Sequence, residues 1–125
     1  MKNYRDTTDG ANTWNINLYR LETTARSIIA TRNNVPIDFN EFDDIVQEIR
    51  TTTDNALVLR LELGSGISID SETSNKIDFD YTPLRTGIKT GDYVHDVFFI
   101  RNGDRLPWIK RSRFTINQNV TEVDE

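Results

Sequence analysis

Apolar side chains recur at every second position along most of this chain. In the segment TWNINLY, Trp14, Ile16 and Leu18 alternate with polar residues, and the segments LVLRLEL at 57–63 and KIDFDY at 76–81 repeat the pattern. Successive side chains of a β-strand point to opposite faces, so this alternation indicates strands with one buried face. Turn-forming residues separate the segments, as in RNN, TTTDN, GSG and SETSN. Short strands with turns at this spacing predict an all-β fold, either a sandwich or a barrel.

One segment departs from this period. From Asp38 to Thr51 the apolar residues lie three and four positions apart, a spacing typical of a helix, and Asn40 is a suitable N-cap. The same segment precedes a polar turn and the leucine-rich strand, which favours a β-hairpin. We therefore predict a strand from about Phe42 to Arg50, and a short helix near 38–50 remains the alternative.

The length and composition of the chain limit the class of protein. A chain of 125 residues has room for one core, so we expect a single β-sandwich domain over 1–125, with 1–12 and 117–125 as flexible or docking arms. Hydrophobic residues make up 36% and charged residues 28%, which favours a soluble protein. No apolar run is long enough to span a membrane, so no membrane partner is expected. The chain has no cysteine, which excludes disulfides, a thiolate nucleophile and a Cys-based zinc site.

The only histidine lies next to an aspartate in the segment GDYVHDVFFI. On a strand, His95 and Asp96 point to opposite faces, so they do not form a catalytic pair with each other. Tyr93 opens this strand after an irregular segment, which is how the tyrosine corner of immunoglobulin-like domains is arranged. By this analogy we expect an immunoglobulin-like antiparallel β-sandwich of about 7–9 strands, in which Tyr93 hydrogen-bonds to the preceding backbone. We expect His95 to be a neutral core residue bonded through one ring nitrogen.

The segment after this strand is predicted to return as its hairpin partner. Asn102 and Gly103 tolerate the positive φ angles of a tight turn, so the return runs to about Ile116. Pro107 donates no ladder hydrogen bond, which places the start of the return at an edge or a bulge. Strand parity gives an inward set, Trp108, Phe114 and Ile116, and an outward set, Ile109, Arg111, Arg113 and Thr115. The expected core contains Trp14, Leu59, Leu61, Phe79, Tyr93, Val97 and Phe114.

We do not expect an enzyme or a bound cofactor. A serine nucleophile requires a base beside it, and the one histidine lies mid-strand without a matching partner in the sequence. Gly64-Ser65-Gly66 lacks the lysine and the further glycine of a phosphate loop and is interpreted as a turn. The acidic residues alternate with apolar ones, as on a solvent-facing strand, so no metal is expected. A calcium cage would have to draw on Asp38, Asp43, Asp44, Asp70, Glu72, Asp78 and Asp80.

Charge is unevenly distributed along the chain. The formal net charge of −5 argues against nucleic acid as a partner. Five basic residues occur between Arg101 and Arg113, and acidic residues crowd the segment from Asp38 to Asp44. Solvated strand edges account for both clusters, and docking between copies of the chain or onto a partner is the other interpretation. The candidate docking residues are Lys110, Arg111, Arg113, Asp43 and Asp44.

Taken in order, several segments resemble small β-sandwich structural proteins of tailed bacteriophages and prophages. They are NTWNINLY, VPIDF, IRTTTDNALVLRLEL, GISIDSETSNKIDFDY and GDYVHDVFFIRNGDRLPWIKRSRFTINQNVTE, and they span about Thr13 to Thr121. The resemblance is to the immunoglobulin-like N-terminal domains of baseplate upper proteins and to small head-fibre or head-tail accessory proteins. The chain departs from that pattern by a histidine where an aromatic residue is usual, and by an extended second strand, RLETTARSII.

The resemblance implies a non-enzymatic virion protein. Such a protein is a building block of the tail or baseplate, or of the head as a fibre, capsid decoration or head-tail accessory protein. It forms a homo-oligomer or another symmetric assembly with other virion structural proteins, inside the cytoplasm of a bacterial host. The alternative function is a carbohydrate-binding or adhesive module that stacks exposed aromatic rings on sugars. The aromatic candidates for that alternative are Trp14, Tyr19, Tyr81, Phe98 and Trp108.

Overall fold

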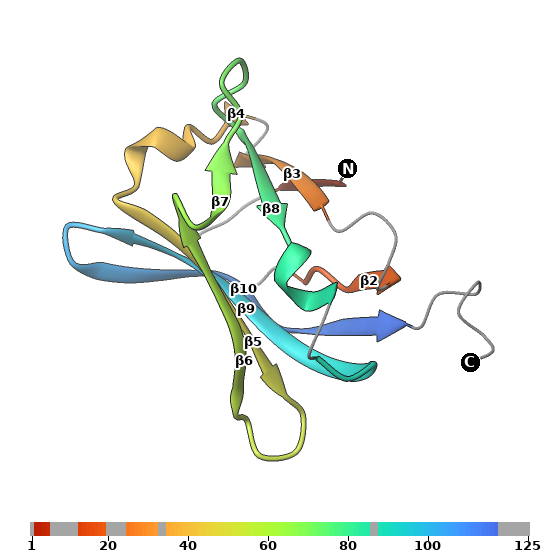
Figure 1. The fold of residues 1–125 in the computed structure, drawn as a ribbon. Coiled ribbons are helices and arrows are strands. Elements are labelled where there is room, and N and C mark those ends of the chain that lie inside the picture. The colour runs from red at the N-terminus through yellow and green to blue at the C-terminus, as the bar shows by residue number, and fades with distance from the viewer. Residues whose placement is uncertain (1, 6–12, 20–24, 33–34, 86–87, 118–125) are drawn as a thin grey trace.

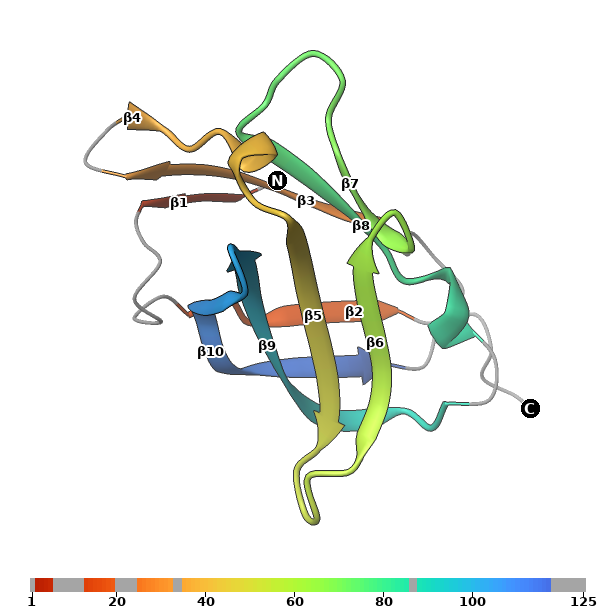
Figure 2. The ribbon, with the colours of Figure 1, turned by 90° about the vertical axis from the view of Figure 1, so that its left-hand side faces the viewer.

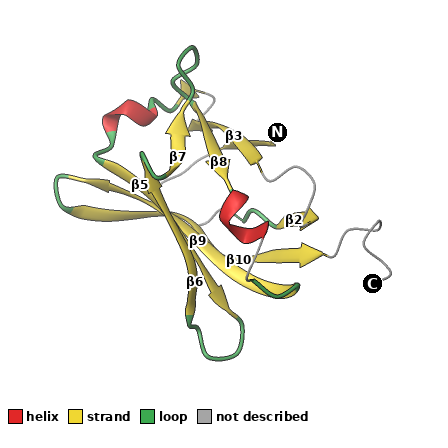
Figure 3. Cartoon of the chain, in the orientation of Figure 1, coloured by secondary structure: helices red, strands yellow, loops and turns green. Residues whose placement is uncertain are grey.

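The computed structural model describes residues 2–5, 13–19, 25–32, 35–85 and 88–117. These residues form strands and two short 3-10 helices, η1 (Phe39–Glu41) and η2 (Thr82–Arg85), so the predicted all-β class is confirmed (Figures 1 and 3). The strands are β1 (Lys2–Arg5), β2 (Ile16–Tyr19), β3 (Ala25–Arg32), β4 (Val35–Pro36), β5 (Asp44–Thr51), β6 (Leu57–Leu63), β7 (Gly66–Ile69), β8 (Lys76–Asp80), β9 (Gly91–Arg101) and β10 (Asp104–Asn117).

The strands form one sheet rather than two. Their order is β1-β3-β8-β7-β6-β5-β9-β10-β2, and β4 adds to β3. The sheet curls into a half-barrel, so that β3 and β8 face β2 and β10 (Figures 1 and 2). The strand pairing therefore forms one curled sheet and not the expected two-sheet sandwich. The continuous link is β7, which pairs with β6 on one side and β8 on the other.

Most neighbouring strands are antiparallel, as expected, but three of the pairs are parallel. These are β1 with β3, β6 with β7, and β10 with β2. The β6–β7 pair consists of only two residue pairs, Glu62 with Gly66 and Leu63 with Ile67. A short tight turn joins these two strands, with positive φ angles at Gly64 and Gly66. The sheet therefore bends sharply at this point.

The core fills the concave side of the sheet. At one end Phe42 stacks on Phe99 at 4.2 Å between ring centroids, and Phe99 stacks on Trp108 at 5.1 Å. At the other end the ring of Trp14 lies 5.3 Å from that of Phe79, across the curl of the sheet. Of the seven residues expected in the core, five are buried, and Leu59 and Tyr93 pack against it while partly exposed.

The ambiguous segment from Asp38 to Thr51 contains both a helical turn and a strand. η1 is the helical part, and its cap is Asp38, whose Oδ1 accepts the N–H of Asn40 at 3.0 Å. Asn40 is thus the donor at this cap and not the capping residue that the sequence predicted. The strand predicted from about Phe42 to Arg50 is confirmed as β5.

β9 and β10 form the predicted hairpin. Asn102 and Gly103 have φ angles of 54° and 83°, the left-handed conformations that a two-residue turn requires. The register between the strands shifts after Pro107 and again after Ile109, so the predicted bulge near Pro107 is confirmed. The shifts also bring Ile109 into the core with 1% exposure, and its predicted outward orientation is wrong.

The chain ends are described only in part. Lys2–Arg5 pairs with β3 as a parallel strand, and Asn117 closes β10. The rest of the proposed arms, residues 1, 6–12 and 118–125, lies outside the described residues. Within the described ranges, no helix has the length and apolar character needed to cross a membrane.

Candidate functional site

A chain of hydrogen bonds runs through the core around His95. The hydroxyl of Tyr81 donates to Gln47 Oε1 at 2.8 Å, and Gln47 Nε2 lies 2.9 Å from His95 Nδ1. His95 Nε2 lies 2.7 Å from the carbonyl oxygen of Trp14. A carbonyl only accepts, so Nε2 carries the proton and Nδ1 accepts from Gln47. The side chains of all four residues are buried. This row of hydrogen bonds connects β5 and β9 to Tyr81, which follows β8, and to Trp14, which precedes β2.

This environment keeps His95 neutral. Burial lowers the pKa of His95 to about 4, although the hydrogen bond to the Trp14 carbonyl and the charge of Asp96 act in the opposite direction. Burial likewise raises the pKa of Tyr81. The prediction of a neutral core histidine is confirmed, but the prediction of one bonded ring nitrogen is wrong, because both nitrogens have partners. A histidine with both nitrogens used and no exposed surface has no free position to accept a substrate proton.

The predicted tyrosine corner is present. The Tyr93 hydroxyl donates to the backbone carbonyl of Lys89 at 2.6 Å, four residues upstream. The parity prediction for β9 is also confirmed, because His95 and Val97 are buried in the core while Asp96 points to the other face. On that outer face, the face of the sheet away from the core, Asp96 Oδ1 accepts the N–H of Arg111 at 2.6 Å.

The candidate docking residues of β10 lie at a bulge. Ile109 pairs with Val97 and Ser112 pairs with His95, so Lys110 and Arg111 together oppose the single residue Asp96. Arg111 has a φ of 39°, a left-handed conformation that is uncommon for a residue with a side chain. Arg111 and Arg113 are exposed, as predicted, and Lys110, which shares the parity of Trp108 and Phe114, is exposed as well.

The bulge separates these three basic residues into two places. Arg111 and Arg113 line an open cleft of about 580 Å³ on the outer face, which we call the basic cleft. Lys110 lines a different hollow of about 160 Å³, beside Asp96 and Arg105. The other residues that line the basic cleft are Asn15, Thr52, Asp92, Tyr93 and Val94.

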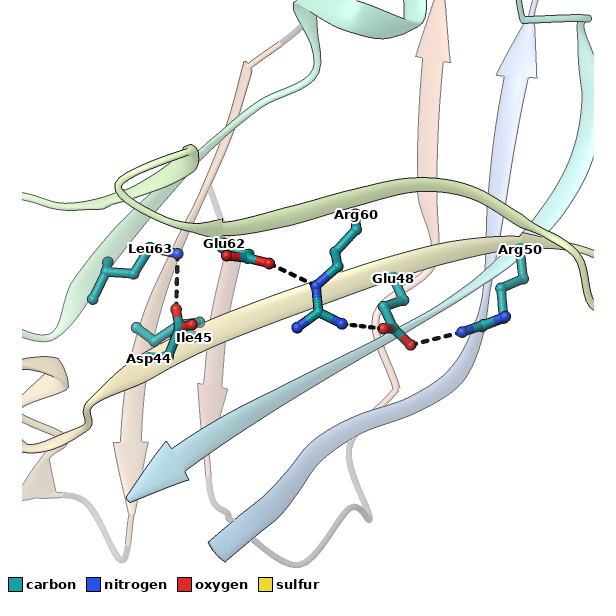
Figure 4. A network of polar contacts seen from close by, with 7 residues as sticks. All are labelled: Asp44, Ile45, Glu48, Arg50, Arg60, Glu62 and Leu63. Carbon is teal, nitrogen blue, oxygen red and sulfur yellow. Dashed lines mark hydrogen bonds and ion pairs between the residues drawn. The ribbon is translucent and has the colours of Figure 1, made fainter. Parts of the chain in front are cut away.

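The two acidic docking candidates have partners within the fold. Asp43 is exposed, and its Oδ2 accepts the N–H of Asn102 at 2.9 Å, at the β9–β10 turn. Asp44 is half-buried, and its Oδ1 accepts the N–H groups of Ile45 at 2.8 Å and Leu63 at 3.0 Å (Figure 4). Asp44 thereby ties β5 to the end of β6. A docking role for these two carboxylates remains a prediction.

A network of ion pairs covers the outer face of β5 and β6. Glu48 is 8% exposed and lies between Arg50 Nη2 at 3.0 Å and Arg60 Nη1 at 2.5 Å, and Arg60 also pairs with Glu62 (Figure 4). Burial alone would raise the pKa of Glu48, but the hydrogen bonds and charges of the two arginines outweigh it and lower the pKa. Glu48 was not among the residues expected to be functional. Its position opposite Arg60 in the predicted hairpin was the feature that indicated an ion pair.

The residues named for calcium or for sugar stacking do not assemble into such sites. Among the described residues, no group of three or more acidic or histidine side chains is placed to hold a metal ion. Several of the carboxylates instead accept local hydrogen bonds, such as Asp80 from Thr82 and Asp70 from Thr73. Four of the five aromatic candidates, Trp14, Tyr81, Phe98 and Trp108, are buried, and Tyr19 is 42% exposed.

No protein-family model matches the chain, and no curated protein matches it. Among solved structures it is similar to one described as the N-terminal domain of phage TP901-1 ORF48, with 11% sequence identity and a TM-score of 0.46. The alignment covers 94% of this chain and 100% of the phage chain. A similarity at this level does not transfer a fold or a function.

Proposed function

We propose that this chain is a structural protein of a bacteriophage virion, a non-enzymatic building block that works in many copies. Its place is in the tail or baseplate, or in the head as a fibre, decoration or head-tail accessory protein. Other virion structural proteins and further copies of the chain are its partners, assembled in the cytoplasm of the bacterial host. The phage-like order of segments from about Thr13 to Thr121 supports the proposal.

The structural observation that carries the proposal is an open strand edge on β6. β6 pairs with β5 along its length, but with β7 only through Glu62 and Leu63. On the side away from β5, residues 57–61 have no strand partner among the described residues. The β5–β6 hairpin also projects from the body of the molecule (Figures 1 and 2). Unpaired backbone groups at such an edge are completed by a strand of a neighbouring chain, which also fixes the orientation of each copy.

The side chains on this edge fit a protein partner. Leu57 at the start of β6 is 49% exposed, and Val58 and Leu59 are partly buried. Proline commonly blocks a free edge, and none occurs in residues 57–61. The pairing of β6 with β5 shifts by one residue at Val58, between the pairs Ile49–Leu59 and Arg50–Leu57, so the bulge lies at the start of β6. Arg60 is the one charged residue in this stretch, and its guanidinium is engaged by Glu48 and Glu62. From Leu59 to Leu61 the edge therefore has neither a proline nor a bulge to oppose pairing.

The non-enzymatic part of the proposal rests on His95. A buried imidazole whose two nitrogens are bonded to Gln47 and Trp14 serves the fold, since neither nitrogen is free for a substrate. The carbohydrate-binding alternative has less support. It requires a row of exposed aromatic rings, and in the described part of the chain the candidates other than Tyr19 are buried.

The proposal can be tested on phage particles purified from a bacterium whose genome encodes this chain. We expect mass spectrometry of purified particles to detect the chain in many copies, together with capsid and tail proteins. The proposal is wrong if complete particles, with all their head and tail proteins, lack the chain.

A pair of variants tests the role of the β6 edge. Leu57→Lys places a charge on the open edge, and lysine at an edge opposes strand pairing, so we expect reduced incorporation into particles. The control is Val35→Lys on β4, where the replaced side chain is 62% exposed and lies away from β6. Circular dichroism should show that both variants fold. Equal incorporation of the two variants would contradict docking through β6.

A further inference from the structure

Two arginines of the basic cleft, Arg111 and Arg113, have no acidic partner among the described residues. In the described part of the chain, Arg50, Arg60 and Arg101 are each paired with a glutamate. No carboxylate of that part lies within ion-pair distance of Arg111 or Arg113, although both line the same cleft. Two guanidinium groups that line one open cleft leave their hydrogen-bond donors for a ligand that accepts them.

The backbone holds these arginines in place. The N–H of Arg111 is bound by Asp96, and the N–H of Arg113 donates to Asn15 Oδ1 at 3.0 Å. Arg111 keeps a φ of 39°, where glycine would be relaxed, so the bulge retains a strained residue that carries a guanidinium. Bulges redirect side chains, and backbone strain of this kind gathers at binding sites.

The remaining surface of the basic cleft defines the ligand. Val94 gives the cleft an apolar surface, and Asn15 and Thr52 add neutral polar groups. Asp92 also lines the cleft, and its Oδ1 accepts the hydroxyl of Thr115 at 3.0 Å. An aspartate or glutamate side chain fits this mixture, since its carboxylate meets the guanidiniums and its methylene groups meet Val94. A nucleic acid fits poorly, because its row of phosphates would approach Asp92 on a chain of net charge −5.

We propose that the basic cleft binds acidic side chains of a segment from another protein chain, through Arg111 and Arg113. The inference rests on the proposed function, because it names the chemistry of one partner that the building block docks with. It also separates the basic residues of β10 by role. Arg111 and Arg113 contact the acidic segment, whereas Lys110 lies at the other hollow and does not.

Binding of labelled peptides to the full chain tests this inference by fluorescence anisotropy. The probe alternates glutamate and serine, and its control replaces each glutamate by glutamine. We expect Arg111→Gly and Arg113→Gln each to weaken binding of the glutamate peptide about tenfold, the effect of losing one charge-assisted contact. Lys110→Gln, which removes the same charge from the same strand, should leave binding within about twofold. Added salt should weaken the wild-type complex.

Arg111→Gly also separates binding from folding. Glycine is relaxed at a φ of 39°, so this variant should unfold at no lower urea concentration than the wild type while its binding is lost. Three results would overturn the inference: equal affinity for the glutamine peptide, an equal loss in Lys110→Gln, or tighter binding of single-stranded DNA. A wild type that binds no acidic peptide, yet is found in purified particles, would refute the acidic ligand and leave the virion function standing.

Discussion

Lowering the pH from 7 to 5 should destabilise the folded protein through His95. In the unfolded chain this imidazole becomes protonated as the pH falls through about 6.5. In the folded protein burial lowers its pKa to about 4, so it stays neutral over the same range. The unfolded state therefore binds more protons than the folded state, and stability decreases as the pH decreases.

The size of the loss follows from the two pKa values. With about 4 in the folded protein and about 6.5 in the unfolded chain, the linkage relation gives a loss of about 2 kcal/mol between pH 7 and pH 5, and about 3 kcal/mol by pH 4. Glu48 also has a lowered pKa, so the stability it contributes is lost only as the pH falls below its unfolded value near 4.5. Measurements above pH 5 thus isolate the histidine.

Urea unfolding at constant ionic strength, followed by the fluorescence of the buried Trp14 and Trp108, measures this loss. The control is His95→Gln, which does not titrate. We expect it to be less stable at pH 7 but nearly independent of pH down to 5, and the chain has no second histidine to confuse the comparison. The reasoning is refuted if wild type and variant lose stability equally, or if the ring of folded His95 titrates near pH 6.5 by NMR.

Three further predictions concern packing and turns, and the same unfolding assay checks each. Leu61→Ala should cost about 2–5 kcal/mol because Leu61 is only 3% exposed, and a loss below about 1 kcal/mol would contradict its place in the core. Gly66→Ala should cost about 1–3 kcal/mol more stability than Gly64→Ala. A Cβ at Gly66 would lie 2.5 Å from Leu61 Cδ2, whereas a Cβ at Gly64 would meet nothing within 4 Å. Equal costs would refute this contact. Tyr93→Phe should cost about 0.5–1.5 kcal/mol by removing the bond to Lys89, and an unchanged midpoint would mean that the tyrosine corner does not stabilise the fold.

Local features were predictable from the sequence because each depends on neighbouring residues. The period of two placed β2, β6 and β8, since strand geometry alone decides which side chains share a face. Asn102-Gly103 predicted its turn because few residues tolerate its φ angles. The inward position of His95 and the bond of Tyr93 followed from the same parity and from one known corner motif.

The closure of the sheet was not predictable in this way. β6 and β7 join through only two residue pairs, and β2 pairs with β10 about a hundred residues later in the chain. No local pattern distinguishes that continuous sheet from two stacked sheets. The partners of His95 were missed for the same reason, although Gln47 shares the parity of Ile45 and Ile49 and was therefore an inward residue on the predicted strand.

The bulge at Lys110 and Arg111 connects the failed parity prediction to the candidate site. Without the extra residue, strict alternation would put Ile109, Arg111 and Arg113 on one face. With it, Ile109 packs in the core beside Val97 while Arg113 stays on the outer face. The inserted residue needs a partner for its backbone N–H, and Asp96, the residue it opposes, supplies the carboxylate. Asp96 therefore hydrogen-bonds to Arg111 on the neighbouring strand and not to His95, its neighbour in the sequence. The aspartate of the His95–Asp96 pair thus stabilises the bulge that places Arg111 in the basic cleft.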